Sequence, residues 1–181
     1  LFRLFKDELL AEGVKPEQII SINFEELEYE PLREYHALYQ YILNQMQPNQ
    51  MNYIFLDEIQ HVDQFHRVVD SLFVKENTDI YITGSNAYFM SSDIATLLTG
   101  RYVEIQMLPL SFAEFYYSKY EEQQYSLIPA YEAYLRESSF PYTQQLGGED
   151  FDIQEYLRGL FNTLLLHDVV ARLKINDVTI L

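Results

Sequence analysis

Apolar residues follow two different spacings along the chain. In some segments they recur every three or four residues, which predicts amphipathic helices; in others they form short apolar runs, which predict buried strands. The helices are expected over residues 1–12, 31–46 and 63–74, and the strands over residues 19–24, 53–56 and 79–83. Gly13 is expected to end the first helix, and Pro48 follows the second, consistent with a break there.

This alternation of apolar strands and helices is typical of an α/β fold in which helices flank a parallel sheet. The same pattern continues with a short helix over residues 91–99 and a further strand over residues 102–107. We therefore predict an α/β core with a parallel sheet covered on both faces.

The pattern changes after Pro109. Ser111 and Glu114 have the spacing of a capping box, which predicts a helix from there to about Tyr120. Two more helices are expected over residues 128–138 and 152–173. The prediction is thus a core over residues 1–110 followed by a helical extension, residues 111–181.

Charge and composition exclude several classes of function. The 181 residues include 28 acidic and 12 basic ones, a formal net charge of −16, and such a surface repels a phosphate backbone. Direct nucleic-acid binding by this chain is therefore disfavoured. There is no cysteine, which excludes disulfides, and no apolar run approaches the roughly 20 residues of a membrane span. We expect a cytoplasmic protein that does not enter a membrane.

The strongest chemical signal is the pair Asp57 and Glu58, directly after the apolar run of residues 53–56. A buried strand would fix both carboxylates at its C-terminal end, where ligands bind in open α/β sheets. Asp57 would then hold Mg²⁺ through water beside nucleotide phosphates, and Glu58 would deprotonate an attacking water. An acid pair that only caps a strand-to-helix turn remains an alternative, and a metal nuclease built on the two acids is a weaker one.

Two weaker signals follow. Ser85 and Asn86 come after the strand that ends near Thr83, where a polar side chain could touch a γ-phosphate. Arg101 follows Gly100 just before the expected strand and could stabilise charge in a transition state. A tight turn and a surface salt bridge, respectively, are the structural alternatives.

Together these segments resemble a known family. The runs FLDEIQHVDQF and ITGSNAYFMSSDIATLLTGRYVEIQMLPLSFAEFY are similar to prokaryotic AAA+-type ATPases that resemble archaeal ATPases, which often carry a C-terminal nuclease-like domain. The resemblance implies a P-loop NTPase-like fold with ATP and Mg²⁺ as cofactors. It also implies that the helical extension, residues 111–181, leads toward a further C-terminal domain. It makes Asp57 and Glu58 the Walker B pair, Asn86 or Ser85 the sensor 1 residue, and Arg101 an arginine finger or phosphate sensor.

The chain departs from the family at one motif. The Gly-x-x-x-x-Gly-Lys-Ser/Thr loop that cradles phosphates is absent, since no glycine here precedes a lysine. The helix expected at Leu1 is the one that follows this loop in the family, so we expect a longer parent protein. The strand before that loop is expected between the strand ending at Thr83 and the one from Tyr102. Without the loop, tight ATP binding by these residues alone is not expected.

Two functions from different classes remain. One is a Mg-dependent ATPase whose hydrolysis drives a conformational change in the intact parent. The other is a non-catalytic scaffold with a degenerate P-loop NTPase fold, which would bind a protein partner or self-associate through the tyrosine-rich helices of residues 111–138.

Overall fold

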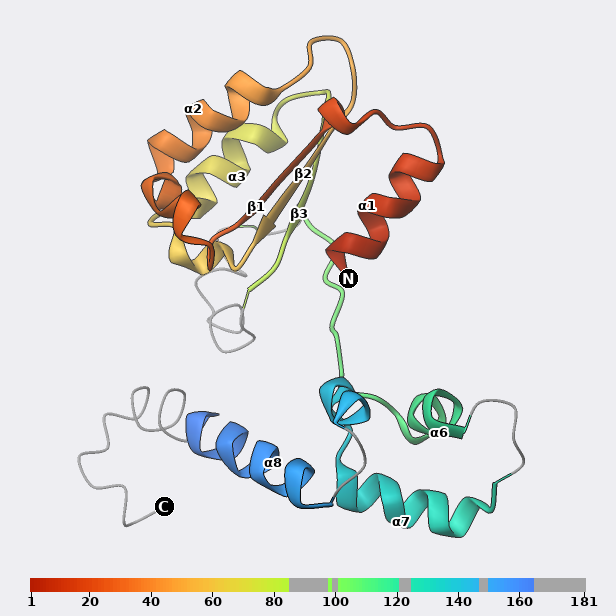
Figure 1. Cartoon of the computed structure of the whole chain (residues 1–181). Helices are drawn as coiled ribbons and strands as arrows, with labels where there is room; N and C mark the ends of the chain where they lie inside the picture. The colour runs from red at the N-terminus through yellow and green to blue at the C-terminus, as the bar shows by residue number, and fades with distance from the viewer. Residues whose placement is uncertain (85–97, 99–100, 121–124, 147–149, 165–181) are drawn as a thin grey trace, which may run out of the picture. The chain divides into compact units, whose positions relative to one another are not determined.

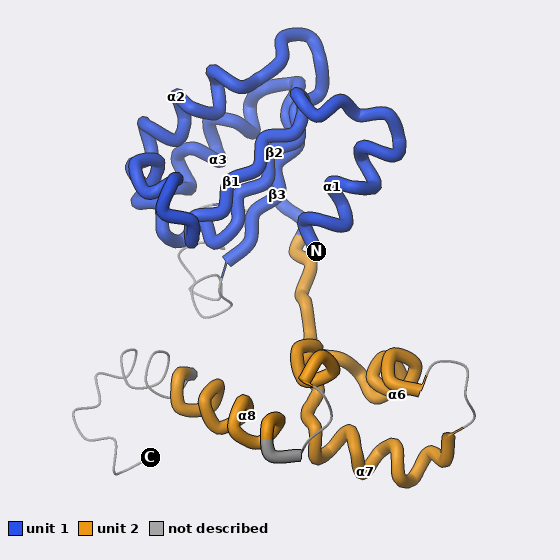
Figure 2. Tube along the Cα trace, in the orientation of Figure 1, with its two compact units in different colours: residues 1–103 blue, residues 104–181 orange. Residues whose placement is uncertain are grey.

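The computed structural model describes residues 1–84, 98, 101–120, 125–146 and 150–164. The chain forms two compact units, Leu1–Val103 and Glu104–Leu181 (Figure 2). That residues 111–181 lead toward a further domain stays a prediction.

The first unit is built on a parallel sheet of three strands in the order β1-β2-β3 (Figure 1). The strands are β1 (Ile19–Asn23), β2 (Asn52–Asp57) and β3 (Thr78–Ile82). They are aligned so that Ile22, Leu56 and Ile82 lie side by side. All three strands were expected from their apolar runs. The predicted α/β class, a parallel sheet flanked by helices as in P-loop NTPases, is confirmed.

Helices cover both faces of this sheet (Figure 1). The described residues of the unit form the α-helices α1 (Phe2–Ala11), α2 (Tyr35–Gln45) and α3 (Phe65–Phe73) and the short 3₁₀ helices η1 (Pro16–Gln18), η2 (Leu27–Arg33) and η3 (Ile59–His61). Helices α2 and α3 lie on one face and α1 on the other. Gly13, at φ +94°, follows α1, as expected for a residue that adopts a left-handed conformation without steric cost.

The main core lies between the sheet and the helices α2 and α3. Because strand side chains alternate between faces, one set of residues from each strand points the same way. The buried cluster includes Ile20, Ile22, Ile54 and Leu56 from the strands, Leu38 and Ile42 from α2, and Val68 and Leu72 from α3. On the opposite face, Phe55 is fully buried against the rings of Phe2, Phe5 and Tyr81. The strands are thus fixed from both sides.

Helix α2 begins later than the pattern of apolar residues predicts. A helix was expected from residue 31, but residues 27–33 form the 3₁₀ helix η2 and α2 starts at Tyr35. Pro31 has no N–H to donate, and Glu34 is extended at φ −86° and ψ 125°. The Glu34 carboxylate caps α2 by accepting hydrogen bonds from the backbone N–H groups of His36 (3.0 Å) and Ala37 (2.9 Å).

This cap makes the stability of the first unit depend on pH. The backbone hydrogen bonds from His36 and Ala37 lower the pKa of Glu34 from its ordinary value of 4.5. A depressed pKa in the folded state contributes stability that is present above the unfolded value and lost as pH falls through the folded one. We expect Glu34→Ala to lower the urea midpoint at pH 7, with a gap from wild type that closes as pH drops below 4.5. Glu30→Ala, which removes an exposed acid from η2, is the control; a gap constant with pH would contradict the assignment.

The second unit is helical. It contains α6 (Phe112–Tyr120), α7 (Leu127–Glu137), the 3₁₀ helix η4 (Pro141–Gln145) and α8 (Asp150–Leu164). The predicted capping box at the start of α6 is confirmed: the N–H (2.8 Å) and hydroxyl (2.7 Å) of Ser111 both donate to Glu114, whose N–H donates back to the hydroxyl (3.3 Å). Ring contacts of Phe112 and Phe115 with Tyr134 join α6 to α7. The predicted helix over residues 152–173 is present as α8, and its last part lies outside the described residues.

The strand predicted over residues 102–107 is wrong. Residues 102–111 form no regular element, and Val103 and Ile105 are 90% and 74% exposed. An extended backbone becomes a strand only by hydrogen bonding to a neighbour, and no strand of the described residues pairs with this one. The helix predicted over residues 91–99 lies outside the described residues apart from Leu98. Within the described chain, no helix has the length and apolar character needed to cross a membrane.

Candidate functional site

Asp57 and Glu58 lie at the carboxyl end of the sheet. Asp57 is the last residue of β2, and Glu58 follows it in the turn into η3. Because the sheet is parallel, the ends of all three strands meet at this edge. Asn23 pairs with Asp57 at the end of β1, and Thr83 comes directly after β3. The edge therefore gathers two carboxylates, an amide and a hydroxyl from three neighbouring strands.

The turn at Glu58 has an unusual backbone. Glu58 adopts a left-handed conformation, at φ 55° and ψ 46°, which costs a non-glycine residue about 1 kcal/mol or more. The chain then turns into η3, where Ile59 is fully buried and its N–H donates to the Thr83 carbonyl at 3.0 Å. Glu58 therefore lies between two fixed neighbours, the end of β2 and the buried, hydrogen-bonded Ile59.

Two neutral side chains bind the two carboxylates. The Thr83 hydroxyl donates to Asp57 Oδ1 and accepts a hydrogen bond from the Glu58 N–H at 3.1 Å. The Gln60 side-chain amide donates to Glu58 Oε2. Gln60 Oε1 is buried and has no partner among the described residues. Both acids are therefore oriented by hydrogen bonds, and each has a second oxygen that no side chain of the described residues binds.

Sequence reasoning did not find Thr83 or Gln60. Thr83 is the last residue of the expected strand, and a hydroxyl at the end of one strand, beside a neighbouring strand that ends in two acids, is itself a signal. Gln60 stands two residues after Glu58. Its contact depends on the left-handed turn, which the sequence does not reveal.

The donor set fits a magnesium ion only in part. In the described chain no group of three or more His, Cys, Asp or Glu residues could hold a metal by itself. Magnesium, however, is usually bound by one or two carboxylates together with waters and substrate phosphates. Asp57, a partly buried hard oxygen donor at a strand end, fits that kind of shared site.

Of the remaining predicted site residues, only Arg101 belongs to the part of the chain that the structure describes. Ser85 and Asn86 lie outside the described residues. Arg101 contacts helix α3: its guanidinium lies 3.5 Å from Asp70 Oδ1 and 5.7 Å from the centroid of the Phe73 ring, and its side chain is half exposed. These contacts match the alternative of a surface salt bridge. A catalytic role for Ser85, Asn86 or Arg101 stays a prediction.

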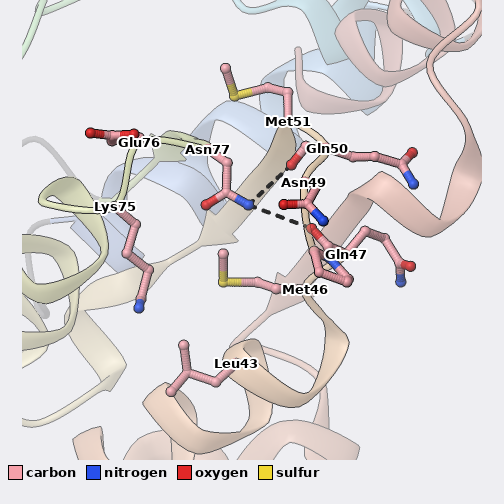
Figure 3. A pocket seen from close by; sticks show the side chains of 10 residues that line it. Leu43, Met46, Gln47, Asn49, Gln50, Met51, Lys75, Glu76 and Asn77 are labelled. Carbon is pink, nitrogen blue, oxygen red and sulfur yellow. Dashed lines mark hydrogen bonds between the residues drawn. The ribbon is translucent and has the colours of Figure 1, made fainter.

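A pocket lies at the opposite end of the sheet, near the start of β2 and β3 (Figure 3). It is lined by residues of the 46–51 turn and of the segment 75–77. The buried Asn52 amide donates to the carbonyls of Gln47, Gln50 and Asn77, and the Asn77 amide donates to Gln50 at 3.1 Å. These polar groups form hydrogen bonds with one another. Their arrangement is explained by the structure of the turn, and we do not assign a second functional site to the pocket.

Comparison with known proteins identifies the family of the first unit. The family model for the AAA domain matches residues 1–116. An uncharacterized protein of Haemophilus influenzae is 38% identical over 184 residues, which cover the whole chain and 45% of that protein. An uncharacterized protein of Methanocaldococcus jannaschii is 32% identical over 185 residues, covering 96% of the chain and 38% of that protein. No solved structure matches the chain.

The chain thus spans less than half the length of these relatives. The AAA model covers the whole first unit and the start of α6, including β2, Asp57 and Glu58. On this match, the chain belongs to the AAA domain family of P-loop ATPase-like proteins.

Proposed function

We propose that the intact protein binds ATP with Mg²⁺ and hydrolyses it to drive a conformational change. The observation that carries this proposal is the placement of Asp57 and Glu58 at the carboxyl end of a buried parallel strand, in a domain of the AAA family. Open α/β sheets bind their ligands at this edge.

Each acid has a distinct role in this proposal. Asp57 would hold Mg²⁺ through the water shell of the ion, which would supply positive charge to neutralise the nucleotide's phosphates. Glu58 orients a water and accepts its proton as the water oxygen attacks the γ-phosphorus. The bond from the γ-phosphorus to the bridging oxygen breaks, and ADP and inorganic phosphate leave. Ser85 or Asn86 is proposed to contact the γ-phosphate, and Arg101 to stabilise the developing charge, within one chain or across an interface.

The proposal requires a phosphate-binding loop that these 181 residues do not contain. Backbone N–H groups and a lysine in such a loop supply most of the phosphate affinity. The test must therefore use the full-length protein. Mg-ATP binding and phosphate release by that protein support the proposal, and a folded full-length protein without nucleotide affinity overturns it.

The second candidate function is a scaffold that keeps the fold without the chemistry. One face of α7 favours it, because Leu127, Ile128 and Leu135 are each more than 60% exposed. If the protein is a scaffold, the full-length protein should have a degenerate phosphate-binding loop and should release no phosphate from ATP. Such a protein would use its helical unit as an interface.

Asp57→Asn tests the proposed magnesium role. The amide keeps the shape of the side chain but loses the charge that holds the ion and its waters. We expect the Mg²⁺ concentration for half-maximal ATP binding to rise about 10–100-fold. Substitution of residues that hydrogen-bond to the ligands of a metal has effects of this size. Titration of a fluorescent ATP analogue against Mg²⁺ measures this. Asp63→Asn, an exposed acid in the same loop region, should leave the titration unchanged; a wild-type titration for Asp57→Asn would refute the role.

A further inference from the structure

Thr83 connects the end of β3 to four consecutive residues of the neighbouring chain segment. Its N–H donates to the Leu56 carbonyl at 3.0 Å, and its carbonyl accepts from the Ile59 N–H at 3.0 Å. Its hydroxyl donates to Asp57 Oδ1 and accepts from the Glu58 N–H at 3.1 Å. Every polar group of Thr83 is thus used at the turn that carries the two acids.

The hydroxyl joins two features that would otherwise be independent. A hydroxyl has one proton to donate and lone pairs to accept. Here the proton fixes the Asp57 carboxylate, and a lone pair fixes the backbone of Glu58 in its left-handed conformation. Threonine is also stiff at χ1 because it is branched at Cβ, so its oxygen is held in place with little loss of entropy. One oxygen atom therefore sets the position of Asp57 relative to Glu58.

Thr83 is also the covalent start of the segment that contains Ser85 and Asn86, from which only Gly84 separates it. A shift of Thr83 along β3 would move the Asp57 carboxylate and the Glu58 backbone together. The hydrogen bonds provide the physical link that such coupling requires.

We propose that Thr83 is a positioning residue that fixes Asp57 and Glu58 relative to each other and links both to the chain that follows β3. The inference rests on the proposed function, because it assigns the shared geometry to the Mg-ATP site. It concerns a residue outside the Walker B pair and the sensor 1 candidates. Thr83 acts through the two carboxyl-bearing residues and is not assigned a contact with the nucleotide.

The test compares three variants of the full-length protein. Thr83→Val keeps the branched shape without the hydroxyl, Thr83→Ala also removes the hydroxyl and avoids any crowding by the new methyl group, and Thr83→Ser keeps the hydroxyl. The matched control is Thr78→Val at the other end of β3, whose hydroxyl donates to the Leu72 (2.8 Å) and Lys75 (3.1 Å) carbonyls. Thermal melts establish that each protein is folded before it is measured.

The first measurement is the Mg²⁺ concentration for half-maximal ATP binding. We expect it to rise about tenfold or more in Thr83→Val and Thr83→Ala, by analogy with other residues that orient metal ligands. Thr83→Ser should restore most of the wild-type dependence, and Thr78→Val should not change it. Wild-type Mg²⁺ dependence in both variants without the hydroxyl would overturn the proposal.

The second measurement does not depend on nucleotide. Amide hydrogen exchange at Glu58 should accelerate by about two- to tenfold without the Thr83 hydroxyl, the factor that one neutral hydrogen bond contributes, and return toward wild type in Thr83→Ser. If the full-length protein binds no ATP, the proposed function fails, and this exchange still decides whether Thr83 fixes the turn. Unchanged exchange at Glu58 would overturn the inference, whatever the nucleotide result.

Discussion

Replacing Glu58 with glutamine in the full-length protein should abolish most phosphate release while Mg-ATP stays bound. A positioned general base contributes about 10²–10⁴ in rate, so we expect kcat to fall by a factor in this range. Glutamine has nearly the same shape as glutamate, and its side-chain oxygen can still accept the hydrogen bond that Gln60 donates to Glu58. The turn should therefore keep its geometry, and the loss should come from the missing proton acceptor alone.

Steady-state phosphate release and equilibrium binding of ATP separate the two effects. Glu76→Gln is the matched control, since Glu76 lines the pocket at the opposite end of the sheet. It should hydrolyse ATP at the wild-type rate. Hydrolysis by Glu58→Gln at that same rate would remove Glu58 from the mechanism, and a loss of ATP binding would show that its role is structural.

Phe55→Ala should strongly destabilise the first unit. Phe55 is fully buried in the middle of β2, on the face of the sheet that α1 covers. Its ring lies edge-on to Phe2 at 5.1 Å and Phe5 at 5.9 Å and stacks on Tyr81 at 4.9 Å between centroids. Truncation removes these contacts and leaves a cavity, which costs about 3–5 kcal/mol for a buried phenylalanine.

Urea unfolding followed by far-UV circular dichroism measures this loss. Phe73→Ala is the control: Phe73 lies in the same unit at the end of α3 and is 49% exposed, so its truncation leaves a smaller cavity. We expect the Phe73 variant to lose less than half as much stability as the Phe55 variant. Equal losses would mean that the aromatic cluster beneath α1 does not hold the sheet.

The sequence was sufficient to predict the α/β core. Each strand of the sheet is a short apolar run, and a run of that kind is stable only when both faces are covered. The positions of the helices followed from spacing and from local signals such as Gly13 and the Ser111–Glu114 capping box, which act within a few residues. The position of Asp57 and Glu58 at a strand end is predictable in the same way, because the two acids directly follow the apolar run of residues 53–56.

The failures concern features that depend on distant residues. Residues 102–107 alternate between apolar and polar types as a strand does, but alternation does not supply a pairing partner. The hydrogen bond between Thr83 and Asp57 joins residues 26 positions apart and depends on the register of β2 and β3. The start of α2 is a local exception: Pro31 and the Glu34 cap end the 3₁₀ helix and begin α2 within an apolar pattern that runs across both.

The left-handed backbone of Glu58 also bears on how this protein would respond to selection. Glycine adopts that conformation without steric cost, and asparagine adopts it more readily than glutamate does. Laboratory evolution for heat resistance alone would therefore favour Gly or Asn at position 58. Stabilising substitutions of this kind often reduce activity where the active site depends on a strained conformation. A library screened only for melting temperature would enrich such replacements, and a glutamate retained there under a combined screen would mark function acting against stability.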